Sequence, residues 1–141
     1  YGYVDKEIEI GNKQRMIAVD TNILIYFLEK NPRYYDQCEA ILMPIFEQKD
    51  YLVLSSIVIA ELTSSNSVDM TFFELPNIRI VAVTEEIAFN SGNLRRTQKL
   101  SLPDAIHIST ALSVNASTFY TNDQQLLKLG RINKLKIVGL K

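Results

Sequence analysis

The stretch that decides the fold is Met16-Ile17-Ala18-Val19-Asp20-Thr21-Asn22, in which four apolar residues lead without interruption into an acid. A short apolar run that does not alternate with polar residues is typical of a parallel strand buried on both faces. The residues that follow, Asn22–Glu29, predict a helix that ends before Asn31-Pro32, because proline disfavours the helical conformation in the residue before it. The opening of the domain is therefore predicted to be a strand, an acid and a helix.

The same alternation continues along the chain. Further strands are predicted at Tyr51–Leu54, Ile78–Val83, Thr118–Tyr120 and Lys136–Val138. Further helices are predicted at Tyr35–Gln48 (kinked or shortened by Pro44), Ser56–Leu62, Thr84 to about Gln98, Leu102–Ser113 and Asp123–Leu129. Strands separated by helices predict an α/β fold, a three-layer α/β/α sandwich with a mostly parallel central sheet.

The length of 141 residues fits a single domain, which we place at residues 16–141. The first fifteen residues are polar and of mixed charge, and we interpret residues 1–15 as an added or upstream extension before a natural start at Met16. A single cysteine, Cys38, excludes an internal disulfide and a Cys-based zinc site, and we expect a buried, inert thiol. No apolar run is long enough to span a membrane and no signal peptide is visible, so we expect a cytoplasmic protein.

Four acids fall at equivalent places in this pattern. Asp20 ends the first strand, Glu61 lies on the helix after the second strand, Asp104 opens the helix Leu102–Ser113, and Asp123 follows the strand Thr118–Tyr120. Ligands of open α/β sheets bind at the carboxyl ends of the strands, where these acids can meet. Each acid alone has an ordinary interpretation as a helix cap, a first-turn acid or a surface residue. Four in this arrangement predict one acidic site.

Clustered carboxylates favour a hard divalent cation. Four such groups repel one another, so without metal at least one should have a raised pKa. One or two Mg²⁺ or Mn²⁺ ions would remove that repulsion and could activate water for attack on a phosphodiester. The lack of clustered histidine and cysteine argues against zinc. The one histidine, His107, lies in an apolar helix face, and we interpret it as structural or as part of an interface rather than as a general base.

With these residues in view, the chain resembles the PIN-domain nucleases, and most of all the VapC-like toxins of type II toxin–antitoxin pairs. The resemblance covers residues 16–141. Four segments carry it: Met16–Tyr26, Leu54–Leu62, Leu102–Ala111 and Phe119–Asp123.

The resemblance implies a function and its residues. It implies an Mg²⁺- or Mn²⁺-dependent endoribonuclease that works as a homodimer and is inhibited by a small antitoxin. The metal-binding and catalytic acids would be Asp20, Glu61, Asp104 and Asp123. Asn22 and Thr121 match positions that support these acids by hydrogen bonding.

The chain departs from that family between Glu61 and Leu75, where VapC-like proteins usually have a longer helical segment. Either the protein is shorter there or a loop is missing from the sequence, since Leu62–Thr71 lacks a helical pattern. That segment often contributes to the RNA groove and the antitoxin contact.

The net charge of −1 gives no indication of nucleic-acid binding, but positive charge is locally concentrated. Arg95, Arg96 and Lys99 precede the Asp104 helix and are candidates to bind RNA phosphates. A second set near the C-terminus is better explained as solvated surface: Arg131, Lys134 and Lys136.

Two rival functions are weighed against a nuclease. One is a PIN-like protein that binds RNA or a partner without cleaving it. The other is a phosphatase of the haloacid-dehalogenase type, which also places an Asp after the first strand. That type needs a second Asp two residues later, where this chain has Asn22.

Overall fold

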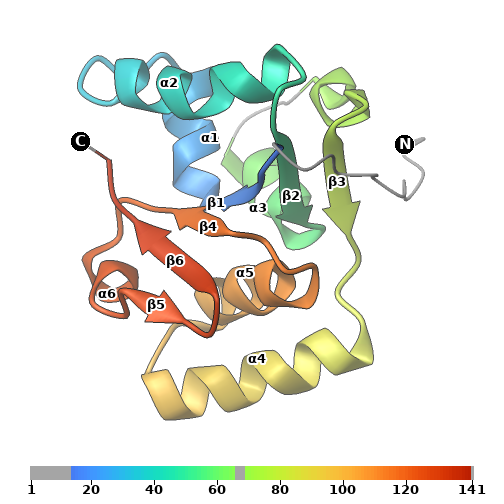
Figure 1. Ribbon diagram of the computed structural model, residues 1–141, viewed down its shortest axis with the longest axis vertical. Helices are drawn as coiled ribbons and strands as arrows, with labels where there is room; N and C mark the ends of the chain where they lie inside the picture. The colour runs from blue at the N-terminus through green and yellow to red at the C-terminus, as the bar shows by residue number, and fades with distance from the viewer. Residues whose placement is uncertain (1–13, 66–68, 141) are drawn as a thin grey trace.

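A computed structural model describes residues 14–65 and 69–140 (Figure 1). The predicted extension at residues 1–15 therefore lies almost wholly outside the described residues. Within the described part, one sheet has the strand order β3-β2-β1-β4-β6-β5. Its strands are β1 (Met16–Val19), β2 (Tyr51–Ser55), β3 (Ile78–Val81), β4 (Thr118–Tyr120), β5 (Arg131–Ile132) and β6 (Leu135–Val138). Neighbouring strands are parallel except β5, which is antiparallel to β6, so the predicted mostly parallel sheet is confirmed.

Helices cover both faces of this sheet, which confirms the predicted sandwich. The helical elements are α1 (Thr21–Leu28), α2 (Tyr35–Phe46), α3 (Ile57–Ser65), η1 (Met70–Glu74), α4 (Glu85–Gln98), α5 (Leu102–Ser113) and α6 (Gln124–Leu127). In Figure 1, α1 and α2 lie on one side of the sheet, and α4 and α5 on the other. No helix in the described ranges is both long and apolar enough to cross a membrane.

The apolar run of β1 is buried on both faces, as the sequence predicts. Ile17 and Val19 pack in one core cluster, with residues of α1, α2 and α3. Met16 and Ala18 face the opposite cluster, with residues of α5 such as Ile108. Successive side chains of a strand point to opposite faces, so a central strand with two covered faces must be apolar throughout.

Three details differ from the sequence prediction. The helix predicted to start within Ser56–Leu62 is α3, which continues to Ser65 into the stretch predicted to lack a helical pattern, and η1 follows it. The hydroxyl groups of Thr63 and Ser64 donate to carbonyl groups one turn earlier, so these poor helix formers are accommodated. At the other end of the chain, the two-residue strand β5 was not predicted.

The helix α2 is shorter than predicted. The helix passes through Pro44 and ends at Phe46, ahead of the predicted end at Gln48. The Pro44 carbonyl oxygen accepts the N–H groups of Lys49 and Asp50 instead of a regular helical partner. This turn leads directly into β2.

The topology brings the predicted acids to one edge. The central strand β1 is parallel to both β2 and β4, so all three end at the same edge. The N–H of Asp20 donates to the carbonyl of Tyr120 at 2.9 Å, which fixes the end of β1 against the end of β4.

Candidate functional site

The four predicted acids line one cavity of about 530 Å³ at the carboxyl edge of the sheet. They come from four different elements, namely the end of β1, α3, the first turn of α5 and the loop after β4. The cavity is lined by Asp20, Thr21, Asn22, Ile25, Glu61, Ser64, Ser101, Pro103, Asp104 and Asp123. The exposed Asn22 is thus placed at the rim, beside the first acid.

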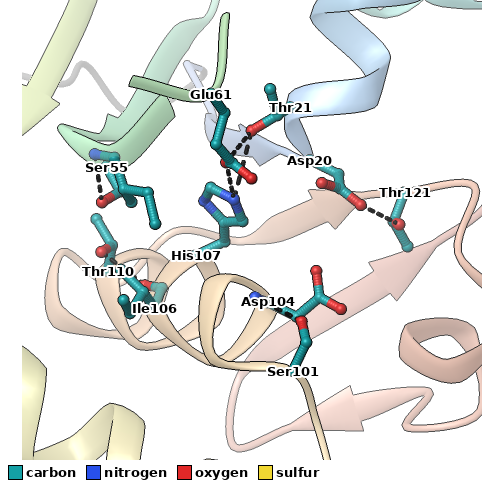
Figure 2. A network of polar contacts seen from close by, with 11 residues as sticks. Asp20, Thr21, Ser55, Glu61, Ser101, Asp104, Ile106, His107, Thr110 and Thr121 are labelled. Carbon is teal, nitrogen blue, oxygen red and sulfur yellow. Dashed lines mark hydrogen bonds and ion pairs between the residues drawn. The ribbon is translucent and has the colours of Figure 1, made fainter. Parts of the chain in front are cut away.

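Asp20 is buried, with 6% of its surface exposed. It occupies the N-cap position of α1, but its side chain makes no capping hydrogen bond. Its Oδ2 atom instead accepts a hydrogen bond of 3.0 Å from the Thr121 hydroxyl group (Figure 2). Burial raises the pKa of Asp20, and the charge of Glu61 adds to the rise, against the lowering effects of His107 and of hydrogen bonds from Thr121 and Thr21. Capping therefore does not account for this acid.

Asp123 both caps the helix α6 and lines the cavity. Its Oδ1 atom accepts a hydrogen bond of 2.7 Å from the N–H of Gln125 and so caps α6. Its own N–H donates to the Thr121 hydroxyl oxygen at 3.0 Å. Thr121 is fully buried and therefore joins Asp20 to the backbone of Asp123.

Asp104 lies half-buried in the first turn of α5. The hydroxyl oxygen of Ser101 caps this helix by accepting the N–H of Asp104 at 3.3 Å, and Pro103 occupies the first turn. Burial raises the pKa of Asp104, and the charges of Asp20 and Asp123 raise it further, against the lowering effects of Ser101 and His107. This mutual repulsion is what a cavity lined by clustered carboxylates should produce.

Glu61 is held by two donors (Figure 2). Its Oε1 atom accepts a hydrogen bond of 2.6 Å from Thr21 and lies 2.8 Å from Nε2 of His107. The Nε2 atom of His107 is itself 3.4 Å from the Thr21 hydroxyl oxygen, so each of the three side chains contacts the other two. The hydrogen bond from His107 holds the pKa of Glu61 below its usual value, although burial acts in the opposite direction.

The contact between His107 and Glu61 was not predicted from the sequence. His107 is buried, which agrees with a structural histidine, but its partner is one of the candidate site acids. One signal was available: Asp104 and His107 are three residues apart, and residues at that spacing lie on the same face of a helix. The identity of the partner depends on how α3 and α5, which pack in different core clusters, approach one another, and no local pattern specifies this.

The donor set fits a hard divalent cation in its chemistry. The acids offer only oxygen atoms, and the raised pKa values of Asp20 and Asp104 indicate negative charge that lacks compensation. Over the described residues, however, no three His, Cys, Asp or Glu side chains are placed closely enough to hold an ion together. Mg²⁺ usually keeps several waters and binds through one or two carboxylates, so a closed protein cage is not required.

The basic residues fall in two separate places. Arg95, Arg96 and Lys99 line a second hollow of about 480 Å³ at the end of α4. The C-terminal set, which comprises Arg131, Lys134 and Lys136, lies exposed around β5 and β6.

The chain matches one family of known proteins along most of its length. The family model of the PIN domain matches residues 17–132. No curated protein sequence matches the chain.

Three solved structures illustrate the structural likeness. VapBC2 from Rickettsia felis, bound to a DNA fragment from its promoter, is 24% identical over 89% of this chain and 99% of that chain, with a TM-score of 0.61. A toxin–antitoxin complex from Klebsiella pneumoniae is 22% identical over 84% of this chain and 94% of its own, with a TM-score of 0.59. FitAcB from Neisseria gonorrhoeae is 22% identical over 78% of this chain and 89% of its own, with a TM-score of 0.57. At these identities the likeness establishes the fold.

Proposed function

The chain belongs to the PIN domain family, and from that premise we propose that it is an endoribonuclease that depends on Mg²⁺ or Mn²⁺. The observation that carries the proposal is the single cavity lined by all four predicted acids: Asp20, Glu61, Asp104 and Asp123. Family membership also removes the phosphatase alternative.

The same four acids are the proposed holders of one or two ions. When bound, such an ion would neutralise the charge of a scissile phosphate and would lower the pKa of a water, so that the water could lose a proton and attack the phosphorus. The residues of the chain prepare the cavity for this. Thr121 orients Asp20 through its hydroxyl group, and His107 and Thr21 orient Glu61. Burial and neighbouring carboxylates raise the pKa values of Asp20 and Asp104, so a bound cation would offset the cost of their ionised forms.

We also propose that the protein is the toxin of a VapBC-type pair, with a small antitoxin as partner and a homodimer as the working form. For the toxin and its antitoxin the support is structural similarity, since the Klebsiella pneumoniae structure is described as a toxin–antitoxin complex. Induced expression should then halt growth of a bacterial host, and Asp20→Asn should relieve the arrest. A short neighbouring gene whose product binds this chain would identify the antitoxin.

The decisive experiment measures cleavage of a labelled single-stranded RNA with added Mn²⁺. We expect Asp20→Asn to lose more than the roughly 10–100-fold that follows loss of a residue supporting a metal ligand. Asp36→Asn removes the same charge from an exposed position on α2 outside the cavity and should cleave like the unaltered protein. Equal cleavage by the Asp20 variant, with contaminating RNase excluded, would defeat the proposal.

The second candidate function is a PIN-domain protein that binds RNA or a partner without cleavage. Calorimetry distinguishes it from the proposed nuclease. Titration of the folded protein with Mn²⁺ should release or absorb heat with a defined stoichiometry. The Asp20→Asn substitution should lower the affinity for Mn²⁺. No Mn²⁺ binding by the folded protein would favour the second candidate.

A further inference from the structure

A basic hollow lies at the elbow between α4 and α5. It is lined by Gly92, Arg95, Arg96, Lys99, Leu100 and Leu102 and measures about 480 Å³. Three of its six lining residues are cations and none is an acid. The two arginines lie in the last turn of α4, and Lys99 ends that helix in the left-handed conformation, with φ of 58°.

This hollow shares a wall with the acidic cavity. The wall is the short link between the two helices together with the first two residues of α5. Leu100 and Leu102 line the basic hollow, whereas Ser101 and Pro103 line the acidic cavity. Alternate residues of one segment thus contact hollows of opposite charge.

The cations of the basic hollow are available to a ligand. All three side chains are exposed. Arg96 donates through Nη2 to the Asn93 amide oxygen at 3.0 Å, which leaves its charge without compensation. In the ranges 14–65 and 69–140, no carboxylate forms an ion pair with Arg95, Arg96 or Lys99.

Opposite charge on the two sides of a wall suits a polyanion. A nucleic-acid strand that places one phosphate in the acidic cavity needs a cation there, and its adjacent phosphates are repelled by the same acids. Arginine and lysine side chains bind phosphates and so fix the position of a strand without reading its bases. The cations of the hollow could therefore bind the adjacent phosphates that the acids of the cavity repel.

We propose that the basic hollow is a phosphate subsite that holds the RNA backbone beside the point of cleavage. This inference rests on the proposed function, because it takes RNA as the substrate. It assigns Arg95, Arg96 and Lys99 to strand binding that does not depend on base sequence.

The test measures RNA binding without cleavage. A fluorescent single-stranded RNA is titrated with Asp20→Asn protein at several salt concentrations, and the affinity is read by anisotropy. The hollow variant carries Arg95→Gln, Arg96→Gln and Lys99→Asn, because asparagine tolerates the left-handed conformation at position 99. The control removes the same charge elsewhere, with Arg131→Gln, Lys134→Gln and Lys136→Gln. Thermal unfolding shows whether both variants fold.

We expect the hollow variant to bind RNA at least 10-fold more weakly. The slope of log affinity against log salt should fall by about 0.7 for each phosphate that the protein no longer neutralises, hence by about 2 for three phosphates. The control variant should keep both values. Equal losses in the two variants would show an effect of bulk charge only and would overturn the subsite.

Two further outcomes also overturn the subsite. One is an unchanged salt slope in the folded hollow variant. The other is a hollow that binds an acidic peptide, such as polyglutamate, but not RNA.

Failure of the proposed function is recognised separately. A protein with an intact Asp20 that binds RNA through the hollow but never cleaves it would refute the nuclease and leave the subsite standing. A protein that cleaves RNA equally well with and without the cations of the hollow would refute the subsite and leave the nuclease standing.

Discussion

The Nε2 atom of His107 lies 2.8 Å from the Oε1 atom of Glu61, across the junction between α5 and α3 (Figure 2). The pKa of Glu61 is lowered, so its carboxylate is ionised at neutral pH and accepts hydrogen bonds only. His107 must therefore carry hydrogen on Nε2. Together with Thr21, which donates to the same oxygen at 2.6 Å, the ring fixes how Glu61 is presented to the cavity.

This relationship predicts that His107→Leu weakens metal binding although His107 does not line the cavity. Losing one donor to a buried or half-buried carboxylate costs about 1.5–3 kcal/mol of unfolding free energy. Residues that orient metal ligands typically affect metal affinity by about 10–100-fold. We expect losses of these sizes in urea denaturation and in Mn²⁺ calorimetry, respectively.

His107→Gln is the matched rescue, because its amide group can donate in place of the ring. It should recover Mn²⁺ affinity more fully than it recovers stability. If His107→Leu lost stability but bound Mn²⁺ with unchanged affinity, the histidine would be a packing residue alone.

The Thr121 hydroxyl group forms hydrogen bonds with both Asp20 and Asp123, so we expect its removal to lower the stability of the fold. Thr121→Val keeps the shape but removes the donor to Asp20 and the acceptor for the N–H of Asp123. A buried polar group left without its partner costs about 1–3 kcal/mol. We expect a loss of that size in the free energy of unfolding, measured by urea denaturation.

Thr118→Val in β4, three residues before Thr121, is the comparison, since among the described residues the Thr118 hydroxyl group forms a hydrogen bond only with that of the adjacent Ser117. Its effect should be smaller. Equal destabilisation by the two substitutions would mean that the link between Asp20 and Asp123 contributes nothing specific.

The raised pKa of Asp104 predicts how metal-free stability changes with pH. A carboxyl group with a higher pKa in the folded state than in the unfolded state binds more protons when folded. Its contribution therefore favours folding below the unfolded pKa of about 3.9 and is lost as the pH rises through the folded value. Asp104→Asn should raise stability at pH 7 without metal, and this gain should shrink towards pH 4.

Metal reverses the sign of that effect. A ligand that binds only the folded state stabilises it, so Mn²⁺ should stabilise the unaltered protein more than Asp104→Asn at pH 7. Urea titrations with Mn²⁺ and with a chelator measure both effects. A variant that is less stable than the unaltered protein without metal would contradict the repulsion between Asp104, Asp20 and Asp123.

The sequence was sufficient for the features that local chemistry decides. The uninterrupted apolar run of β1 predicted a strand covered on both faces, and the core clusters on its two sides confirm it. The acids could be expected at one edge because parallel strands end together, and the structure places all four in one cavity.

The remaining features depend on contacts between distant segments. His107 and Glu61 are 46 positions apart, and their contact depends on how α3 and α5, which pack in different core clusters, approach one another. The strand β5 is too short to have a pattern of its own and exists through its pairing with β6. The basic character of the hollow was visible in Arg95, Arg96 and Lys99, but its shared wall with the acidic cavity follows only from the packing of the elbow between α4 and α5.

Asp123 allows capping to be separated from metal binding. Asparagine caps helices about as well as aspartate, so Asp123→Asn should keep the hydrogen bond to Gln125 and leave stability nearly unchanged. Asp123→Ala should lose about 1 kcal/mol, the typical value of an N-cap. Both variants remove the carboxylate from the cavity and should weaken Mn²⁺ binding alike in calorimetry. If Asp123→Asn bound Mn²⁺ as the unaltered protein does, Asp123 would be a cap and the site would contain three acids.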